Sequence, residues 1–200
     1  AKFGFLGGAA AKDEMAILAG SYFDNEILRA NGSAAVRLLR AAALDDQSIA
    51  EAFAAFEPLP HRMNEVGIFG GVRCVDDSKA TSLAALAAGV RMCRGAVRLI
   101  AGGLPKGDDP REVLTTLTER VKKVYLIGKS AEQFSAVWSK SVDCEICGTI
   151  DRAVAVAMRE AESGETLLLS PGAASLDQFH SFGERGDVFA DLVKKEGTNR

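Results

Sequence analysis

The sequence has few aromatic residues, little proline, two histidines and no excess of positive charge. Aromatic side chains make up 6% of its 200 residues, and 24 lysine and arginine residues stand against 27 acidic ones, so the net charge is −3. A chain with this charge has no broad basic surface that would neutralise the phosphates of a nucleic acid. We therefore expect no nucleic-acid partner.

Long apolar runs are also missing. No run approaches the roughly 20 residues that span a bilayer, and no secretory signal pattern is present. These absences predict a cytoplasmic protein without a membrane partner. The length suits one domain, or one domain with part of another, and needs no disulfide or metal to explain folding. The first residue is Ala1 and not Met, which fits the expectation of a piece of a longer protein.

Four cysteines are present, and two of them, Cys144 and Cys147, form a CxxC motif. A zinc site would need two more ligands at similar spacing, and His61 and His180 are scattered. A redox pair would open a helix, whereas residues 142–147 alternate apolar and polar side chains as a strand does. We expect reduced structural thiols and no metal ligands.

From residue 64 onward, short apolar runs alternate with segments of helical periodicity. The runs are residues 72–76, 97–101, 124–127, 144–146 and 166–169. This succession predicts an α/β fold, a mostly parallel sheet with helices on both faces. Residues 64–68 and the run at 72, joined by Gly70 and Gly71, predict a hairpin at a sheet edge. The last helix is expected from Asp187 to Gly197.

Residues 1–59 have a different pattern. Alanine and leucine dominate residues 34–44, and apolar side chains repeat at helical spacing after Asp46 and Ser48, which are candidate caps. The pattern predicts two successive helices, preceded by a hairpin of residues 3–8 and 15–18. These elements make a poor independent domain. Because residues 58–60 then read Pro-Leu-Pro, we place a domain boundary between residues 59 and 60.

In an open parallel sheet, ligands collect beyond the carboxyl ends of the strands. Three loops at such positions are rich in glycine and polar residues, namely residues 76–82, 101–109 and 169–179. In the first loop, Lys79 opposes the dipole of the helix that follows, which makes sense if an anion binds there. A solvated loop capped by Ser78 or Thr81 explains the same residues equally well.

The second loop has two glycines, Gly102 and Gly103, directly after a strand, which allow a ligand to approach the backbone. Gly102 and Gly107 have the spacing of the two glycines of a nucleotide P-loop, but Asp108 follows where the loop needs Lys-Ser/Thr. Gly128-Lys129-Ser130 has that ending but lacks the first glycine, so neither segment is a P-loop. The third loop combines small residues and hydroxyl groups, which leave room for a carboxylate ligand. Within it, Asp177 is also explained as a helix cap, and Phe179 as part of the core.

Four motifs together resemble the C-terminal domain of the Mur ligases, over about residues 58–196. They are Leu59-Pro60-His61-Arg62, Asp77-Ser78-Lys79-Ala80-Thr81, Gly102-Gly103 with Lys106-Gly107, and Ser170-Pro171 through Ser175-Leu176-Asp177-Gln178-Phe179. The last string resembles the branch of the family that adds D-glutamate. The resemblance implies a Rossmann-like C-terminal domain at residues 60–200, which binds D-glutamate. Residues 1–59 are then the remnant of a central ATP-binding domain.

The family phosphorylates the carboxylate of UDP-MurNAc-L-alanine with ATP, and the amine of D-glutamate then attacks the acyl phosphate. The resemblance implies a catalytic role for Lys79 near the transferred phosphate and nucleotide contacts by Arg62 and Asp77. It also implies D-glutamate contacts by Thr81, Lys106, Ser175 and Phe182, the last through its backbone.

The sequence departs from the family in two ways. The family's P-loop and Mg²⁺ ligands belong to the central domain and are not in this chain. ATP and Mg²⁺ are thus expected in the full-length enzyme, whose N-terminal and central domains would be partners of this chain, and the chain alone is expected to be inactive. In addition, Ala30 and Ala34 stand where the family has nucleotide-contacting groups.

Two other functions remain open. One is a noncatalytic ligand-binding or interaction module that keeps the fold, which Ala30 and Ala34 favour. The other is a folate-type polyglutamate ligase, which shares the fold but is disfavoured by the string at residues 175–179.

Overall fold

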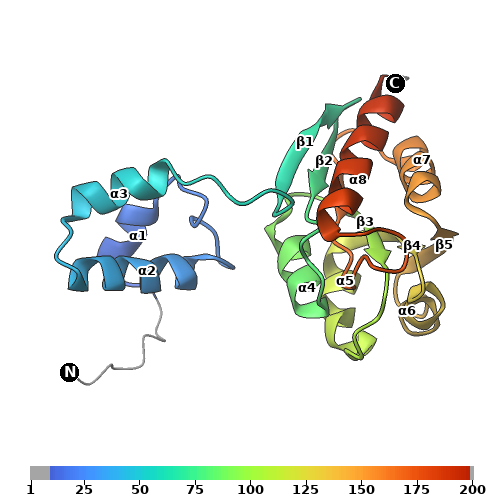
Figure 1. The fold of residues 1–200 in the computed structure, drawn as a ribbon, viewed down its shortest axis with the longest axis horizontal. Coiled ribbons are helices and arrows are strands. Elements are labelled where there is room, and N and C mark those ends of the chain that lie inside the picture. The colour runs from blue at the N-terminus through green and yellow to red at the C-terminus, as the bar shows by residue number, and fades with distance from the viewer. Residues whose placement is uncertain (1–9, 199–200) are drawn as a thin grey trace. The chain divides into compact units, whose positions relative to one another are not determined.

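The computed structural model describes residues 10–198, and the chain divides into two compact units between Pro58 and Leu59 (Figure 1). The first unit contains three helices, α1 (Lys12–Leu18), α2 (Arg29–Ala41) and α3 (Asp46–Ala54). Their apolar faces meet in a small core of Ile17, Leu18, Val36, Ile49 and Phe53. Burial of these side chains holds the three short helices together.

An ion pair also joins α1 to α2. The Arg37 guanidinium lies 2.6 Å from the Glu14 carboxylate, which is buried. The hydrogen bond from Arg37 holds the pKa of Glu14 at about 2, so this carboxylate stays ionised.

The two helices predicted for this unit are confirmed, whereas the predicted cap of the second helix and the predicted strand at residues 15–18 are wrong. The two predicted helices are α2 and α3, although Asp45 and not Asp46 caps α3, by accepting from the Ser48 N–H. The hairpin is wrong for residues 15–18, which lie in α1 because Ile17 and Leu18 are buried on one helical face. The other predicted strand, residues 3–8, falls outside the described residues.

The second unit is built on one six-stranded sheet with the order β1-β2-β6-β3-β4-β5. The strands are β1 (Asn64–Phe69), β2 (Val72–Asp76), β3 (Val97–Gly102), β4 (Val121–Ile127), β5 (Asp143–Gly148) and β6 (Thr166–Leu169). All neighbours pair in parallel except β1 and β2. The predicted edge hairpin is therefore confirmed as β1 and β2.

Helices cover both faces of this sheet, as predicted (Figure 1). They are α4 (Leu83–Met92), the short 3-10 helix η1 (Pro110–Val113), α5 (Leu114–Arg120), α6 (Ala131–Trp138), α7 (Ile150–Glu160) and α8 (Phe182–Gly197). Successive residues of a strand point to opposite faces. Leu99 accordingly packs in the core with α4, α5 and α6, and Ile100 packs in the core with α7 and α8. Within residues 10–198, no helix is long and apolar enough to cross a membrane.

The last helix begins earlier than its apolar pattern indicates. It starts at Phe182 and not at Asp187, because the Ser181 side chain accepts a hydrogen bond from the Glu184 N–H and caps the helix there. Its end at Gly197 is as predicted. The extra turn matters because it brings Phe182 and Arg185 to the loops described below.

The CxxC motif lies in β5, as the alternation of its side chains predicted. Cys144 packs against the core on one face of the sheet, and Cys147 is buried in the core on the other. Burial raises the pKa of each thiol to about 11. Both are free thiols, and this placement supports their interpretation as structural residues.

Candidate ligand-binding site

Two of the three loops singled out in the sequence follow the neighbouring strands β2 and β6, and the third follows β3 on the other side of β6. Backbone hydrogen bonds join them directly. The Gly172 N–H donates to Ala80 O at 2.9 Å, and Leu104 and Ala174 exchange bonds of 2.8 and 3.0 Å. The sheet order thus brings the three loops together at the carboxyl edge, as predicted.

Two polar side chains at this edge are paired across the loops. The Lys106 ammonium in the loop after β3 donates to the Thr81 hydroxyl in the loop after β2, with Nζ 2.9 Å from Oγ1. Lys106 is exposed and Thr81 is half-buried. The pair presents a cation and a hydroxyl group to the same patch of solvent, a combination suited to a carboxylate.

Lys79 lies close to the start of α8. Its Nζ is 3.9 Å from the centroid of the Phe182 ring, within the range of a cation–π interaction. Both side chains are half-buried.

A buried arginine on α8 links these loops. Arg185 on α8 donates from Nε to Ser78 Oγ at 3.0 Å, from a terminal nitrogen to Ser78 O at 2.9 Å, and from the other to Ala173 O at 3.2 Å. The Ser78 hydroxyl in turn donates to Phe182 O at 2.7 Å. Arg185 is 1% exposed, and burial lowers the pKa of its guanidinium to about 10. The arginine therefore fixes the loops after β2 and β6 against α8.

The sequence reasoning did not identify Arg185. One signal was available, since Arg185 lies four residues before the buried Phe189 and therefore on the inner face of the same helix. An arginine in that position requires buried acceptors, and the nearby loops provide them.

A histidine and an aspartate hold the other side of the loop after β2. His61 Nδ1 is 2.7 Å from Asp76 Oδ2, the Ser78 N–H donates to Asp76 Oδ1 at 2.8 Å, and the Lys79 N–H donates to His61 O at 3.0 Å. Gly186 makes room for this pair, because a Cβ at Gly186 would collide with the His61 ring. Asp76 and His61 thereby hold the backbone of the neighbouring residues Ser78 and Lys79.

Asp77 points into the protein. It is 7% exposed, and its carboxyl oxygens accept from the Ser170 hydroxyl at 2.8 Å and from the Met63 N–H at 3.4 Å. Burial raises its pKa to about 7. A nucleotide contact by Asp77 would require this carboxyl group to be uncovered, whereas Arg62 is exposed. Both nucleotide contacts stay predictions.

The third loop holds Ser175, which is buried and closes a turn by accepting the N–H groups of Gln178 and Phe179 at its carbonyl. Phe179 packs against the core, as one of its two interpretations stated. Asp177 does not cap a helix. Its carboxylate accepts from the Lys129 N–H at 2.9 Å and so ties this loop to the one after β4.

Gly102, the last residue of β3, and Gly103, which follows it, serve the packing of the loops. A Cβ at Gly102 would collide with Ile127 O, and a Cβ at Gly103 with Ala174 O. Both residues have positive φ angles, 118° and 141°. At these two positions the missing Cβ therefore makes room for protein backbone, and the approach of a ligand to this loop stays a prediction.

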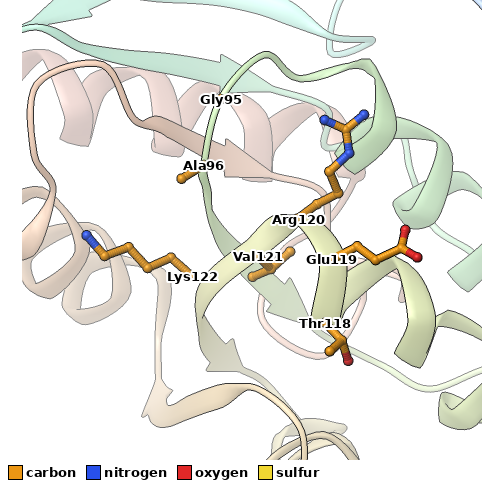
Figure 2. A pocket seen from close by; sticks show the side chains of 7 residues that line it. All are labelled: Gly95, Ala96, Thr118, Glu119, Arg120, Val121 and Lys122. Carbon is orange, nitrogen blue, oxygen red and sulfur yellow. The ribbon is translucent and has the colours of Figure 1, made fainter.

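A separate hollow of about 450 Å³ lies at the opposite, amino edge of the sheet (Figure 2). It is lined by residues just before β3, at the end of α5 and at the start of β4: Gly95, Ala96, Thr118, Glu119, Arg120, Val121 and Lys122. The Lys122 ammonium is paired with Glu162 and Glu165. None of the predicted site residues lines this hollow, so we place the candidate site at the carboxyl edge.

Comparisons with known proteins agree with this fold. The sequence pattern described as "Mur ligase, glutamate ligase domain" matches residues 61–173. UDP-N-acetylmuramoylalanine–D-glutamate ligase from Nitratidesulfovibrio vulgaris is 39% identical over 166 residues, which are 83% of this chain and 38% of that protein. The protein of the same name from Cereibacter sphaeroides is 44% identical over 164 residues, 82% of this chain and 35% of that protein. The chain therefore spans little more than a third of these relatives.

Solved structures share the fold. A bifunctional folylpolyglutamate synthase/dihydrofolate synthase from Yersinia pestis superposes with a TM-score of 0.61 at 25% identity, over 82% of this chain and 39% of that one. MurF ligase from Thermotoga maritima, solved in complex with ADP, gives a TM-score of 0.60 at 17% identity, over 86% and 39% of the two chains. The second likeness shows the fold alone.

Proposed function

Since the chain belongs to the family of the Mur ligase glutamate ligase domain, we propose that it is the C-terminal part of a D-glutamate-adding peptidoglycan-precursor ligase. Its residues 60–200 would form the D-glutamate-binding domain, and residues 1–59 would be the end of a central ATP-binding domain. The observation that carries the proposal is the pairing of Lys106 with Thr81 beside Lys79, at the edge of the sheet where ligands bind.

The reaction would join D-glutamate to UDP-MurNAc-L-alanine. A carboxylate is a poor acyl donor, and ATP would supply the phosphoryl group that makes one of its oxygens a leaving group. The D-glutamate amine would then form the amide bond as the carbon–oxygen bond to phosphate breaks and the amine loses a proton. We place this chemistry in the cytoplasm, where ATP is available.

This chain's residues would bind and orient D-glutamate. Lys106 would attract a carboxylate by charge, and Thr81 would hold Lys106 in place through the 2.9 Å hydrogen bond. Phe182 opens α8, and the free N–H groups of a first helical turn attract anions. Thr81 and Ser175 would also contact the D-glutamate carboxylates, and Lys79 would lie near the transferred phosphate.

ATP and Mg²⁺ would be held mainly by parts of the protein outside this chain. Residues 10–198 contain no group of three or more His, Cys, Asp or Glu arranged to hold a metal ion. We assign no step to the metal here. Arg62 is the exposed group that would reach a nucleotide.

The chain alone should not ligate. Its sequence has no complete P-loop, so purified protein supplied with ATP, Mg²⁺, UDP-MurNAc-L-alanine and D-glutamate should release no phosphate. Steady phosphate release by the pure chain would contradict this expectation.

Calorimetric titration with D-glutamate tests the proposed binding role. We expect weak binding by the wild type and a loss of heat in Lys106→Ala. The matched control is Lys129→Ala, which removes another exposed lysine at the same edge of the sheet. Equal heats for the wild type and Lys106→Ala would overturn the assignment.

A noncatalytic module with the same fold is a second candidate, favoured by Ala30 and Ala34 on α2, where the family has nucleotide-contacting groups. The gene sequence upstream of the Ala1 codon distinguishes the ligase from the noncatalytic module. A Gly-x-x-x-x-Gly-Lys-Ser/Thr encoded in the same frame supports the ligase, and a start codon directly before Ala1 supports the module. The named relatives weigh against the folate-type alternative.

A further inference from the structure

Lys79 is held by an aromatic ring and not by a carboxylate. Its Nζ is 3.9 Å from the Phe182 ring centroid, and it takes part in none of the ion pairs found among residues 10–198. The face of an aromatic ring attracts a cation without cancelling its charge. The ammonium therefore keeps its full charge for an anion that arrives from the side away from the ring.

The backbone that carries the ring is fixed, and the ring has a second aromatic neighbour. The Phe182 carbonyl accepts from the Ser78 hydroxyl at 2.7 Å, and Arg185 donates to the same hydroxyl at 3.0 Å. The His61 ring packs edge-on against Phe182, with the centroids 6.2 Å apart. Because Ser78 directly precedes Lys79, the bond that fixes the Phe182 backbone also ties it to the loop that carries the lysine.

We propose that the ring of Phe182 is a positioning group for Lys79, which holds the ammonium in place to receive an anion with phosphate chemistry. A lysine side chain loses rotamer freedom when it binds, and a ring that restricts it beforehand reduces this cost. The choice of a phosphate-like anion as the partner of Lys79 rests on the proposed function, whereas the contact between Lys79 and the ring does not.

Nuclear magnetic resonance of the 200-residue chain tests the ring contact. Protons above an aromatic face are shifted upfield, so the Lys79 Hε resonances, assigned with Lys79→Arg, should lie upfield of those of Lys106. Phe182→Tyr should keep this shift and Phe182→Leu should abolish it. An unshifted Lys79 in the wild type would overturn the proposal even if Phe182→Leu fails to fold, and so would an unchanged shift in a folded Phe182→Leu.

Titration with inorganic phosphate, followed at the same resonances, tests the positioning. Phe182→Leu removes the cation–π contact and should therefore bind phosphate about threefold more weakly than the wild type. Phe182→Tyr keeps an aromatic ring and should bind phosphate as the wild type does. Equal affinities in all three proteins would overturn the positioning role. A wild-type chain that binds no phosphate would also overturn the positioning role. If that chain still binds D-glutamate, the proposed function is unaffected by this result.

Discussion

The Lys106 ammonium donates a hydrogen bond to the Thr81 hydroxyl across 2.9 Å, and so joins the loops after β3 and β2. The two residues are 25 positions apart in the chain, yet the order of the strands places them at one edge of the sheet. The bond holds an exposed cation in one place before any ligand arrives, which reduces the entropy cost of binding.

Replacement of Thr81 by valine should weaken D-glutamate binding. The hydroxyl is lost while the shape is kept, and a hydrogen bond of this type contributes about 0.5–1.5 kcal/mol, or roughly two- to tenfold in affinity. Thr81→Ser should bind as the wild type does. In calorimetric titrations, Thr81→Val should add little to the effect of Lys106→Ala, because both changes remove the same interaction. Fully additive effects would contradict the pairing.

Asp77 should make the stability of the fold depend on pH. Burial raises its pKa to about 7, so below that pH the folded state keeps a proton that the unfolded state releases near its ordinary pKa of 3.8. The resulting stabilisation is complete below the ordinary pKa and is lost as the pH rises through about 7. Asp77→Asn, which is always neutral, should therefore become more stable relative to the wild type from pH 5 to pH 8, by on the order of 1–3 kcal/mol.

Urea denaturation at several pH values measures this difference. Asp191→Asn on the exposed side of α8 is the control, and its stability should follow that of the wild type. A difference between Asp77→Asn and the wild type that stays constant with pH would show that Asp77 is ionised throughout.

Gly186→Ala should destabilise the second unit by about 1–3 kcal/mol, because the added Cβ would collide with the His61 ring and lie 2.6 Å from Asp76 Oδ2. Gly183→Ala, three residues earlier in α8, is the matched control. Its Cβ would meet no atom closer than 3.5 Å. Because alanine has a higher helix propensity than glycine, this variant should be at least as stable as the wild type. Thermal unfolding compares the two, and equal losses would argue against close packing at Gly186.

Arg185→Met should lower the free energy of unfolding by on the order of 2–4 kcal/mol, since it leaves buried acceptors on Ser78 and Ala173 without their donor. Arg111→Met is the surface control, because Arg111 is exposed and forms a surface ion pair with Asp109, and we expect little change. Urea denaturation measures both. A similar small effect in the two variants would mean that Arg185 does not fix the loops.

The sheet was predictable because its signals are local. Runs such as residues 97–101 are short, apolar and bounded by turn residues, and parallel strands with intervening helices follow from their spacing. Residues 15–18 were not predictable in the same way, since an apolar run of four residues is compatible with a strand or a helix. The start of α8 depends on a single serine cap.

The location of the site followed from topology, but its internal contacts did not. Arg185 and Ser78 are 107 positions apart, and no local pattern pairs them. No local pattern predicts either that Gly103 lies against the carbonyl of Ala174. Side chains that support a site act through distant backbone groups, which only the folded chain brings together.

Amide chemical-shift mapping of the 200-residue chain during addition of D-glutamate tests the central claim most directly. We predict saturable changes in the loops at residues 77–81, 103–107 and 171–182, with residues 95–96 and 118–122 around the hollow of Figure 2 unaffected. No change at high D-glutamate, or changes confined to that hollow, would contradict the assignment of a D-glutamate site to the carboxyl edge of the sheet.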